Sequence, residues 1–196
     1  SAIRRFFGDH KFIEAQTPVL QVCPVMDAHI HGFKTELFGV DRAQKRELYL
    51  QTSPEFDMKK LIVAGMERIY QICPVFRNAE GTPRQVPEFT MLEWYRAHAD
   101  YTHIMDDCVL LLRAVAKAAG VNHFQHKDYQ CDPFAEWERL SVAVAFQTYA
   151  QIDLEECIDD FTFFKSQVEA IGVRVAEADA WDDVFHAVMA EKIEPF

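Results

Sequence analysis

The sequence predicts an α+β fold, with helices flanking an antiparallel sheet. Two observations predict it. Apolar segments with the alternation of strands lie close together around residues 68–97, and the segments that resemble helices do not alternate with strands in a regular βαβ rhythm. The sequence contains no internal repeat, low-complexity tract or Gly/Ser-rich linker. We therefore expect a single domain without an internal boundary.

The N-terminal segment predicts a helix followed by a strand. Phe6, Phe7 and His10 recur at helical spacing within residues 2–12. An extended segment then leads to Pro18, which is unfavourable inside a regular element.

A second strand and helix follow in residues 47–66. A short apolar strand precedes Ser53, which is expected to cap the helix, with Pro54 at its first position and Glu55 in its first turn. Gly65 marks the far end of this helix.

Residues 68–76 and 87–97 are expected to pair as an antiparallel hairpin. Pro74 has no amide proton to donate, so its strand must lie at an edge or contain a bulge at that point. A long helix over residues 102–119 should end at Gly120, and the C-terminal third should be helical.

Composition limits the function. With 196 residues, 49% of them hydrophobic, the chain can bury a sizeable core. The net charge of −11 argues against general affinity for nucleic-acid phosphates and suits a small-molecule or basic protein partner. The five cysteines form no CxxC pair, residues 1–12 lack the apolar segment and cleavage site typical of a signal peptide, and the sequence contains no apolar run of transmembrane length. We therefore expect reduced thiols in a cytoplasmic protein.

Alternation along the predicted hairpin sorts its side chains into faces, because successive strand residues point to opposite sides. One face of the second strand carries Phe89, Met91, Glu93 and Tyr95. One face of the first strand carries Gln71, Cys73 and Val75, and then Arg77. If these faces coincide, charged and aromatic groups share one surface of the sheet. Buried charged groups need partners, and a bound ligand could supply them. The alternatives are an Arg77–Glu93 ion pair on a solvated face and a plain core role for Phe89.

Three segments resemble class II aminoacyl-tRNA synthetases, in the version of the lysine enzymes and their short paralogues, the elongation factor P–lysine ligases. VFRNAEGTPRQVPEFTMLEWYRA, residues 75–97, resembles motif 2. FFGDHKFIEAQTPVL, residues 6–20, is similar to motif 1, and TSPEFDMKKLIVAGMERIYQI, residues 52–72, continues the family pattern. The segments TSPE and MLEWYR are more similar to the short paralogues than to the lysine enzymes. The resemblance implies a class II synthetase-like antiparallel sheet flanked by helices.

The resemblance also implies an ATP site. Arg77 would be catalytic and would hold the α-phosphate, where a fixed guanidinium stabilises developing charge. Phe89 would stack on adenine. Arg84 in the motif 2 loop would approach the outer phosphates, its alternative being a solvated loop arginine. Magnesium is expected to accompany ATP, although its protein ligands in this family belong to motif 3.

For the amino acid, the resemblance assigns Glu93 to an ammonium group and Tyr95 to a side-chain amine. Ser53, Pro54 and Glu55 would line the pocket at the start of the helix, and Ser53 can also be an ordinary helix cap. Lysine or β-lysine fits this set, since two ammonium groups need separate carboxylates.

The sequence departs from the family pattern in motif 2. Ala79 stands where the family has a glutamate that reads the adenine amino group, and Glu80 is the residue that could replace it. Gln85 and Val86 replace the usual His-Asn pair. No motif 3 and no preceding anticodon-binding barrel occur in residues 1–196, so we expect a partial catalytic domain.

The function that the resemblance implies is activation of lysine or β-lysine by ATP and transfer to a lysine of elongation factor P. The enzyme would be a homodimer through motif 1. The alternatives are a tRNA-charging lysyl enzyme and a catalytically silent paralogue that binds or regulates.

Two further patterns need an interpretation. A spacing of two separates Asp27, His29 and His31, so on a strand their side chains would share one face and could bind a metal. The family pattern, however, has similar residues at this point without a metal. The apolar C-terminal helices are expected to cover the sheet, and the positions around Phe185, Met189 and Ile193 are predicted to be core, the alternative being a groove for a partner.

Overall fold

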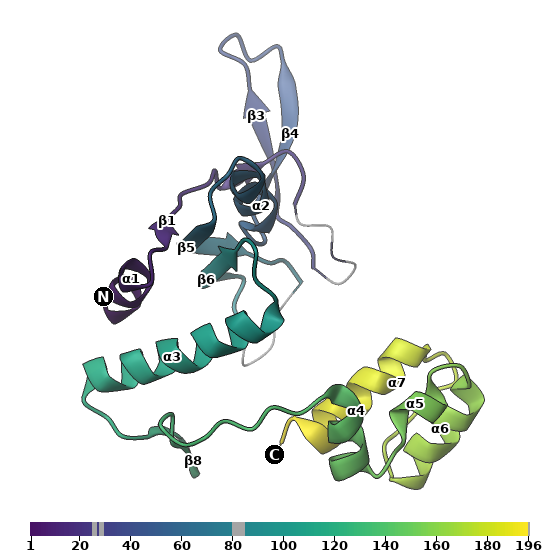
Figure 1. The fold of residues 1–196 in the computed structure, drawn as a ribbon. Coiled ribbons are helices and arrows are strands. Elements are labelled where there is room, and N and C mark those ends of the chain that lie inside the picture. The colour runs from purple at the N-terminus through teal and green to yellow at the C-terminus, as the bar shows by residue number, and fades with distance from the viewer. Residues whose placement is uncertain (25–26, 28–29, 80–84, 196) are drawn as a thin grey trace. The chain divides into compact units, whose positions relative to one another are not determined.

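The structure is a computed structural model that describes residues 1–24, 27, 30–79 and 85–195. It divides the chain into two compact units, Ser1–Ala135 and Glu136–Phe196, which we describe separately (Figure 1). The sequence predicted no boundary inside the chain. The division arises because the apolar side chains after residue 145 bury one another in a core of their own.

The first unit has the α+β fold that the sequence predicts. Its elements are α1 (Ala2–Asp9), β1 (Ile13–Glu14), β2 (Leu20–Gln21), β3 (Lys34–Phe38), β4 (Lys45–Leu50), α2 (Glu55–Val63), β5 (Arg68–Phe76), β6 (Glu88–Arg96), α3 (Tyr101–Ala119), β7 (Phe124–His126) and β8 (Tyr129–Cys131). The hairpin β5–β6 and the helix α3 confirm the predicted segments. Gly120 ends α3 in the left-handed conformation, with a φ of 70°.

The central sheet has the strand order β1-β5-β6. β5 and β6 pair along their full length, from Arg68 opposite Arg96 to Phe76 opposite Glu88. β1 adds parallel pairing only at residues 69–70 of β5. Pro74 therefore lies on an edge of the sheet, as its missing amide proton requires.

A second sheet, β2-β4-β3, was only partly predicted. The sequence indicated the strand that is now β4, whereas β3 was missed. The two strands form a hairpin that projects beyond the central sheet (Figure 1). Two lysine–glutamate pairs, Lys34–Glu47 and Lys45–Glu36, connect them across the ladder.

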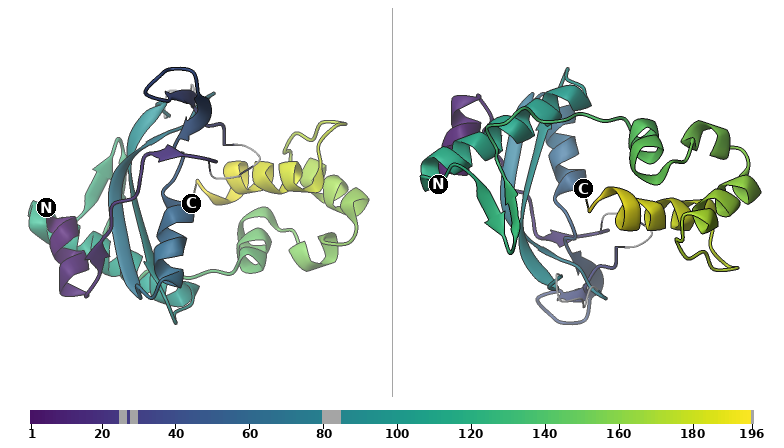
Figure 2. Two further views of the ribbon diagram at one scale, coloured as in Figure 1. Left: turned by 90° about the horizontal axis from the view of Figure 1, so that it is seen from above. Right: turned by 90° about the horizontal axis from the view of Figure 1, so that it is seen from below.

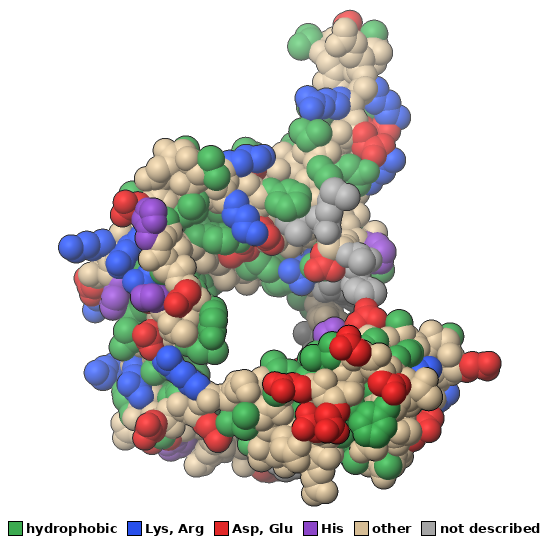
Figure 3. Space-filling model, turned by 45° about the vertical axis from the view of Figure 1, so that its right-hand side comes forward, with side chains coloured by type: hydrophobic (Ala, Val, Ile, Leu, Met, Phe, Trp, Pro, Cys, Tyr) green, Lys and Arg blue, Asp and Glu red, His purple; other side chains and the backbone are tan. Residues whose placement is uncertain are grey.

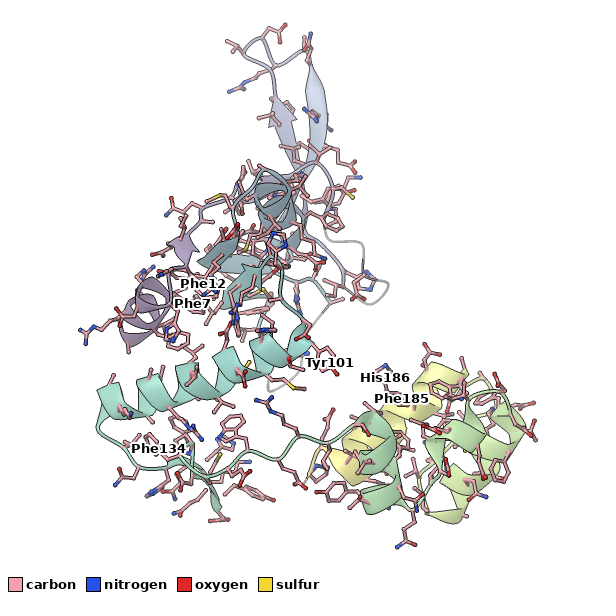
Figure 4. The ribbon with its side chains drawn as sticks, viewed as in Figure 1. Phe7, Phe12, Tyr101, Phe134, Phe185 and His186 are labelled. Atoms are coloured by element: carbon pink, nitrogen blue, oxygen red, sulfur yellow. The ribbon has the colours of Figure 1, made fainter. Side chains whose placement is uncertain are left out.

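Helices α1 and α3 cover one face of the β5–β6 pair, and α2 lies against the other face (Figure 2). On the first face, Phe7 stacks on Tyr70 with ring centroids 4.4 Å apart and meets Phe12 edge-on (Figure 4). On the second face, Met58 of α2 is fully buried against Ile69. The remaining length of this second face contains the polar side chains that the sequence singled out.

The second unit is helical, as predicted. Its elements are α4 (Val142–Ala145), the π-helical turn η1 (Phe146–Ala150), α5 (Leu154–Cys157), α6 (Phe161–Ala170), α7 (Trp181–Val188) and the π-helical turn η2 (Met189–Ile193). Phe185, labelled in Figure 4, stacks on Phe146 and Trp181 at 5.1 and 5.3 Å. Met189 and Ile193 pack against the same core, so their core role is confirmed. These side chains bury apolar surface within their own unit. That the helices also cover the sheet stays a prediction.

Among the described residues, no helix combines the length and the apolar character that crossing a bilayer requires.

Candidate functional site

The register of β5 and β6 places the predicted side chains on one face. Gln71 lies opposite Glu93, Cys73 opposite Met91 and Val75 opposite Phe89. Directly paired residues of antiparallel strands point to the same side, so the two predicted faces coincide. Tyr95 belongs to this face and packs beside α2. We refer to this surface as the site face.

Glu93 is held at both of its carboxylate oxygens. Ser53 Oγ donates a 2.7 Å hydrogen bond to Oε2, and the Tyr95 hydroxyl donates a 2.5 Å hydrogen bond to Oε1. Burial, followed by the hydrogen bond to Glu93, raises the pKa of Tyr95, so the phenol stays a proton donor at neutral pH. A carboxylate fixed in this way is oriented to receive an ammonium group.

The start of α2 differs by one position from the prediction. Pro54 is the N-cap rather than the first helical residue, because its carbonyl already accepts the helical hydrogen bond from the Met58 amide, at 2.9 Å. Ser53 Oγ accepts a 3.1 Å hydrogen bond from the Glu55 amide just inside the helix. Ser53 therefore both caps the helix and contacts Glu93. Glu55 forms a 2.5 Å ion pair with Lys59, one turn later.

Arg77 follows the end of β5 and lies beside Phe89. Its Nε donates a 3.2 Å hydrogen bond to the Thr52 carbonyl, and its guanidinium carbon is 5.4 Å from the centroid of the Phe89 ring. The ion pairs between described residues do not include one from Arg77 to Glu93, which overturns that alternative. The outer nitrogens of Arg77 therefore do not neutralise the Glu93 carboxylate.

The motif 2 loop is described up to Ala79 and again from Gln85. Ala79 has a φ of 62°, a left-handed conformation that is uncommon for a residue with a β-carbon, and its amide donates to Asn78 Oδ1. Asn78 in turn donates a 2.7 Å backbone hydrogen bond to His31. The predicted residues Glu80 and Arg84 lie outside the described residues.

The structure brings together no metal cluster in the part of the chain that it describes. No three His, Cys, Asp or Glu side chains there are close enough to hold an ion. His29, the middle residue of the possible metal pattern, lies outside the described residues.

Sequence reasoning missed two polar residues that adjoin the site. Gln51 and Thr52 are both fully buried. The Gln51 amide donates a 2.8 Å hydrogen bond to the Pro74 carbonyl, and the Thr52 carbonyl accepts from Arg77. The available signal was a polar Gln-Thr-Ser run directly after β4. A further buried amide, Gln71, exchanges hydrogen bonds of 3.0–3.2 Å with Thr17 and faces Glu93.

The charge of the chain is unevenly distributed between the two units. Residues 136–196 contain 14 acidic and four basic side chains, whereas residues 1–135 contain 17 and 16. The second unit therefore accounts for −10 of the net charge of −11. Figure 3 shows acidic side chains gathered on the visible face of this unit, with few Lys or Arg beside them.

Comparison with known proteins identifies similar sequences. The family model described as tRNA synthetases class II (D, K and N) matches residues 1–186 and so extends through both units. A protein named elongation factor P–(R)-β-lysine ligase from Vibrio atlanticus is 47% identical over 125 residues, which cover 64% of this chain and 39% of that protein. Proteins of the same name from Actinobacillus succinogenes and Enterobacter sp. are 38% and 39% identical over 151 residues, covering 77% of this chain and 42% of each relative. The chain thus spans about two fifths of the length of these curated relatives.

Proposed function

Because the chain belongs to the class II tRNA synthetases (D, K and N), we propose that it contributes to an ATP-dependent ligase that activates lysine or β-lysine as an adenylate. The activated amino acid is then transferred to a lysine of elongation factor P, in the cytoplasm. The names of the similar proteins support this substrate and this acceptor.

The observation that carries the proposal is the site face itself. Glu93, with both oxygens held by Ser53 and Tyr95, provides a fixed negative charge. Phe89 lies four residues before Glu93 on the same strand and face, next to the Arg77 guanidinium. An ammonium site and an anion site on one sheet face match the two ends of an amino acid whose carboxylate must meet a phosphate.

In the proposed first step, the carboxylate of the bound amino acid attacks the α-phosphorus of ATP. A bond between carboxylate oxygen and phosphorus forms, and the bond from phosphorus to pyrophosphate breaks. Arg77 is proposed to stabilise the charge on the α-phosphate, and Phe89 to stack on adenine. Glu93 holds the amino group away from the reacting carboxylate, while Tyr95 contacts a side-chain amine.

In the proposed second step, the amine of an acceptor lysine attacks the acyl carbon of the adenylate. The new bond is an amide, AMP leaves, and the amine loses a proton. Magnesium would neutralise phosphate charge when ATP is bound, and the residues described here offer no three-ligand group for it.

The charge distribution favours a protein acceptor over tRNA. A polyanion would be repelled by the second unit, where 14 acidic side chains stand against four basic ones. A lysine on a protein arrives as a cation and meets no such repulsion.

We also propose that the chain forms a homodimer through motif 1. Ile13 and Leu20 of motif 1 are 55% and 49% exposed, and Val22, two residues after it, is 63% exposed, so a second copy could cover all three side chains. Sedimentation of the purified chain tests the proposal: we expect a dimer that Val22→Asp converts to monomer.

The first test of the ligase is amino-acid-dependent exchange of pyrophosphate into ATP, with lysine and β-lysine supplied separately. We expect exchange with one of them and its loss in Arg77→Ala. The preferred amino acid, followed by transfer assays with elongation factor P and tRNA, separates the ligase from a tRNA-charging enzyme. Absence of exchange, together with absence of lysine binding, would favour a catalytically silent paralogue, which Ala79 in the adenine-reading position also supports.

A further inference from the structure

The amine-binding and phosphate-binding parts of the site face are joined by residues 51–53, between β4 and α2. We propose that Gln51 is a positioning residue that fixes this segment and thereby makes the binding of the amino acid and of ATP interdependent. The inference rests on the proposed function for the identity of the ligands, and on the contacts of residues 51–53 for the connection itself.

Gln51 anchors the segment to its neighbours by three hydrogen bonds. Its backbone N–H donates to the Val19 carbonyl, and its backbone carbonyl accepts from the Phe76 backbone N–H, both at 2.9 Å. Its side-chain Nε2 donates to the Pro74 carbonyl at 2.8 Å. Pro74 and Phe76 belong to the edge of β5 that β1 leaves uncovered, so Gln51 fills the place of a partner strand there.

The two residues that follow Gln51 each hold one half of the site. The Thr52 carbonyl accepts the 3.2 Å hydrogen bond from Arg77 Nε, which orients the proposed α-phosphate ligand. Ser53 Oγ donates the 2.7 Å hydrogen bond to Glu93, the proposed ammonium ligand. These two contacts are made by consecutive residues of the chain. A displacement of Glu93 therefore moves the carbonyl that holds Arg77.

Burial of polar atoms in this segment is unusual. Gln51 Oε1 and Thr52 Oγ1 are buried without a hydrogen-bond partner among the described residues. Nearly all such atoms in folded proteins have a partner, because burying one without compensation costs stability. Apolar side chains would fill the same space without that cost. Retention of polar groups here is typical of a functional site and does not fit a role in packing alone.

The expected consequence is positive coupling between the two ligands. An amino acid that fixes Glu93 also fixes Ser53, Thr52 and Arg77, so ATP binds to an arginine that is already oriented. The coupling is reciprocal: each ligand should raise the affinity for the other by the same factor.

The connection can be tested without any ligand, by hydrogen exchange at Arg77 Nε measured by nuclear magnetic resonance. This proton is protected by the Thr52 carbonyl. We expect at least a fivefold faster exchange in Gln51→Met and in Ser53→Ala, although neither residue contacts the guanidinium. Gln125→Met is the matched control, because Gln125 also donates its amide to a backbone carbonyl, that of Lys127, but lies in β7. Unchanged exchange in Ser53→Ala would overturn the proposal even if Gln51→Met failed to fold.

The functional consequence is tested by calorimetry of lysine or β-lysine binding with and without a non-hydrolysable ATP analogue. We expect the affinity ratio to exceed fivefold in the natural chain and in Gln125→Met, and to approach one in Gln51→Met. A purely structural role would lower both affinities or the melting temperature and leave the ratio unchanged, which would contradict the proposal. If the natural chain bound neither ligand, the proposed function would fail, and the exchange measurement would still decide whether residues 51–53 connect Glu93 and Arg77.

Discussion

The Tyr95 hydroxyl donates a 2.5 Å hydrogen bond to Oε1 of Glu93, two residues away on the same face of β6. Burial and this hydrogen bond both raise the pKa of the phenol. A raised pKa in the folded state means that the neutral phenol stabilises the fold, and that this stabilisation is lost as the pH rises through the folded value.

We therefore expect the free energy of unfolding to fall above about pH 10, the ordinary pKa of tyrosine, by at most about 1.4 kcal/mol per pH unit from this group. Below that pH the group should cause no change. Urea unfolding of the natural chain and of Tyr95→Phe between pH 8 and about pH 11 measures the difference. Tyr129→Phe, at an exposed position of β8, is the control. If the free energy of unfolding changed with pH in the same way for Tyr95→Phe and for the natural chain, the expectation would be contradicted.

Glu93→Gln should abolish recognition of the ammonium group while keeping the shape of the side chain. We expect the binding of lysine or β-lysine to weaken by about 2–5 kcal/mol, because the ammonium group of the bound ligand would lose its partner carboxylate. Ser53→Ala should weaken it by only about 0.5–1.5 kcal/mol, the contribution of one neutral hydrogen bond. Calorimetric titration measures both changes. Glu88→Gln is the matched control, since Glu88 lies on the same strand but is exposed on the opposite face.

The alternation of side chains was sufficient to predict the site face. β5 and β6 are both nine residues long and pair without an interruption, so period two assigned Gln71, Phe89, Glu93 and Tyr95 to one surface. The contacts across that surface were not predictable in the same way. Ser53 and Glu93 are 40 positions apart in the sequence, and no local sequence pattern predicts that their side chains form a hydrogen bond.

The boundary between the two units was missed for a physical reason. A domain boundary often shows as a flexible linker, but here the change lies in which apolar residues bury one another. Phe146 and Phe164 belong to a core with Val184 and Val188, which helical spacing alone cannot distinguish from residues that cover a sheet. The difference in net charge across residue 135 was visible in the sequence and is the signal that could have located the boundary.

The ion pair between Arg96 and Asp107 connects β6 to α3 in the interior of the first unit. The side chains are 15% and 4% exposed, and Arg96 Nε and Asp107 Oδ2 are without a partner among the described residues. Asp107→Ala should lower the free energy of unfolding by about 3–5 kcal/mol, because it leaves a buried charge unpaired. The double change Arg96→Met with Asp107→Leu should recover most of that loss. Urea unfolding decides the question, with Lys60→Met at an exposed pair as the control. A double variant as unstable as the single one would show that shape, not charge, dominates there.

Residues 136–196 should fold without the rest of the chain, because their apolar core is built only from their own side chains. Far-ultraviolet circular dichroism of this segment should give a helical spectrum and one cooperative thermal transition. Phe146, fully buried between Phe164 and Phe185, is the residue on which the core depends most. Phe146→Ala should cost about 3–5 kcal/mol and leave the segment unfolded, since a unit of this size has little stability to lose. Ile158→Ala, at a position 59% exposed, should change the transition little. A natural segment without a cooperative transition would mean that this core forms only in the presence of the first unit.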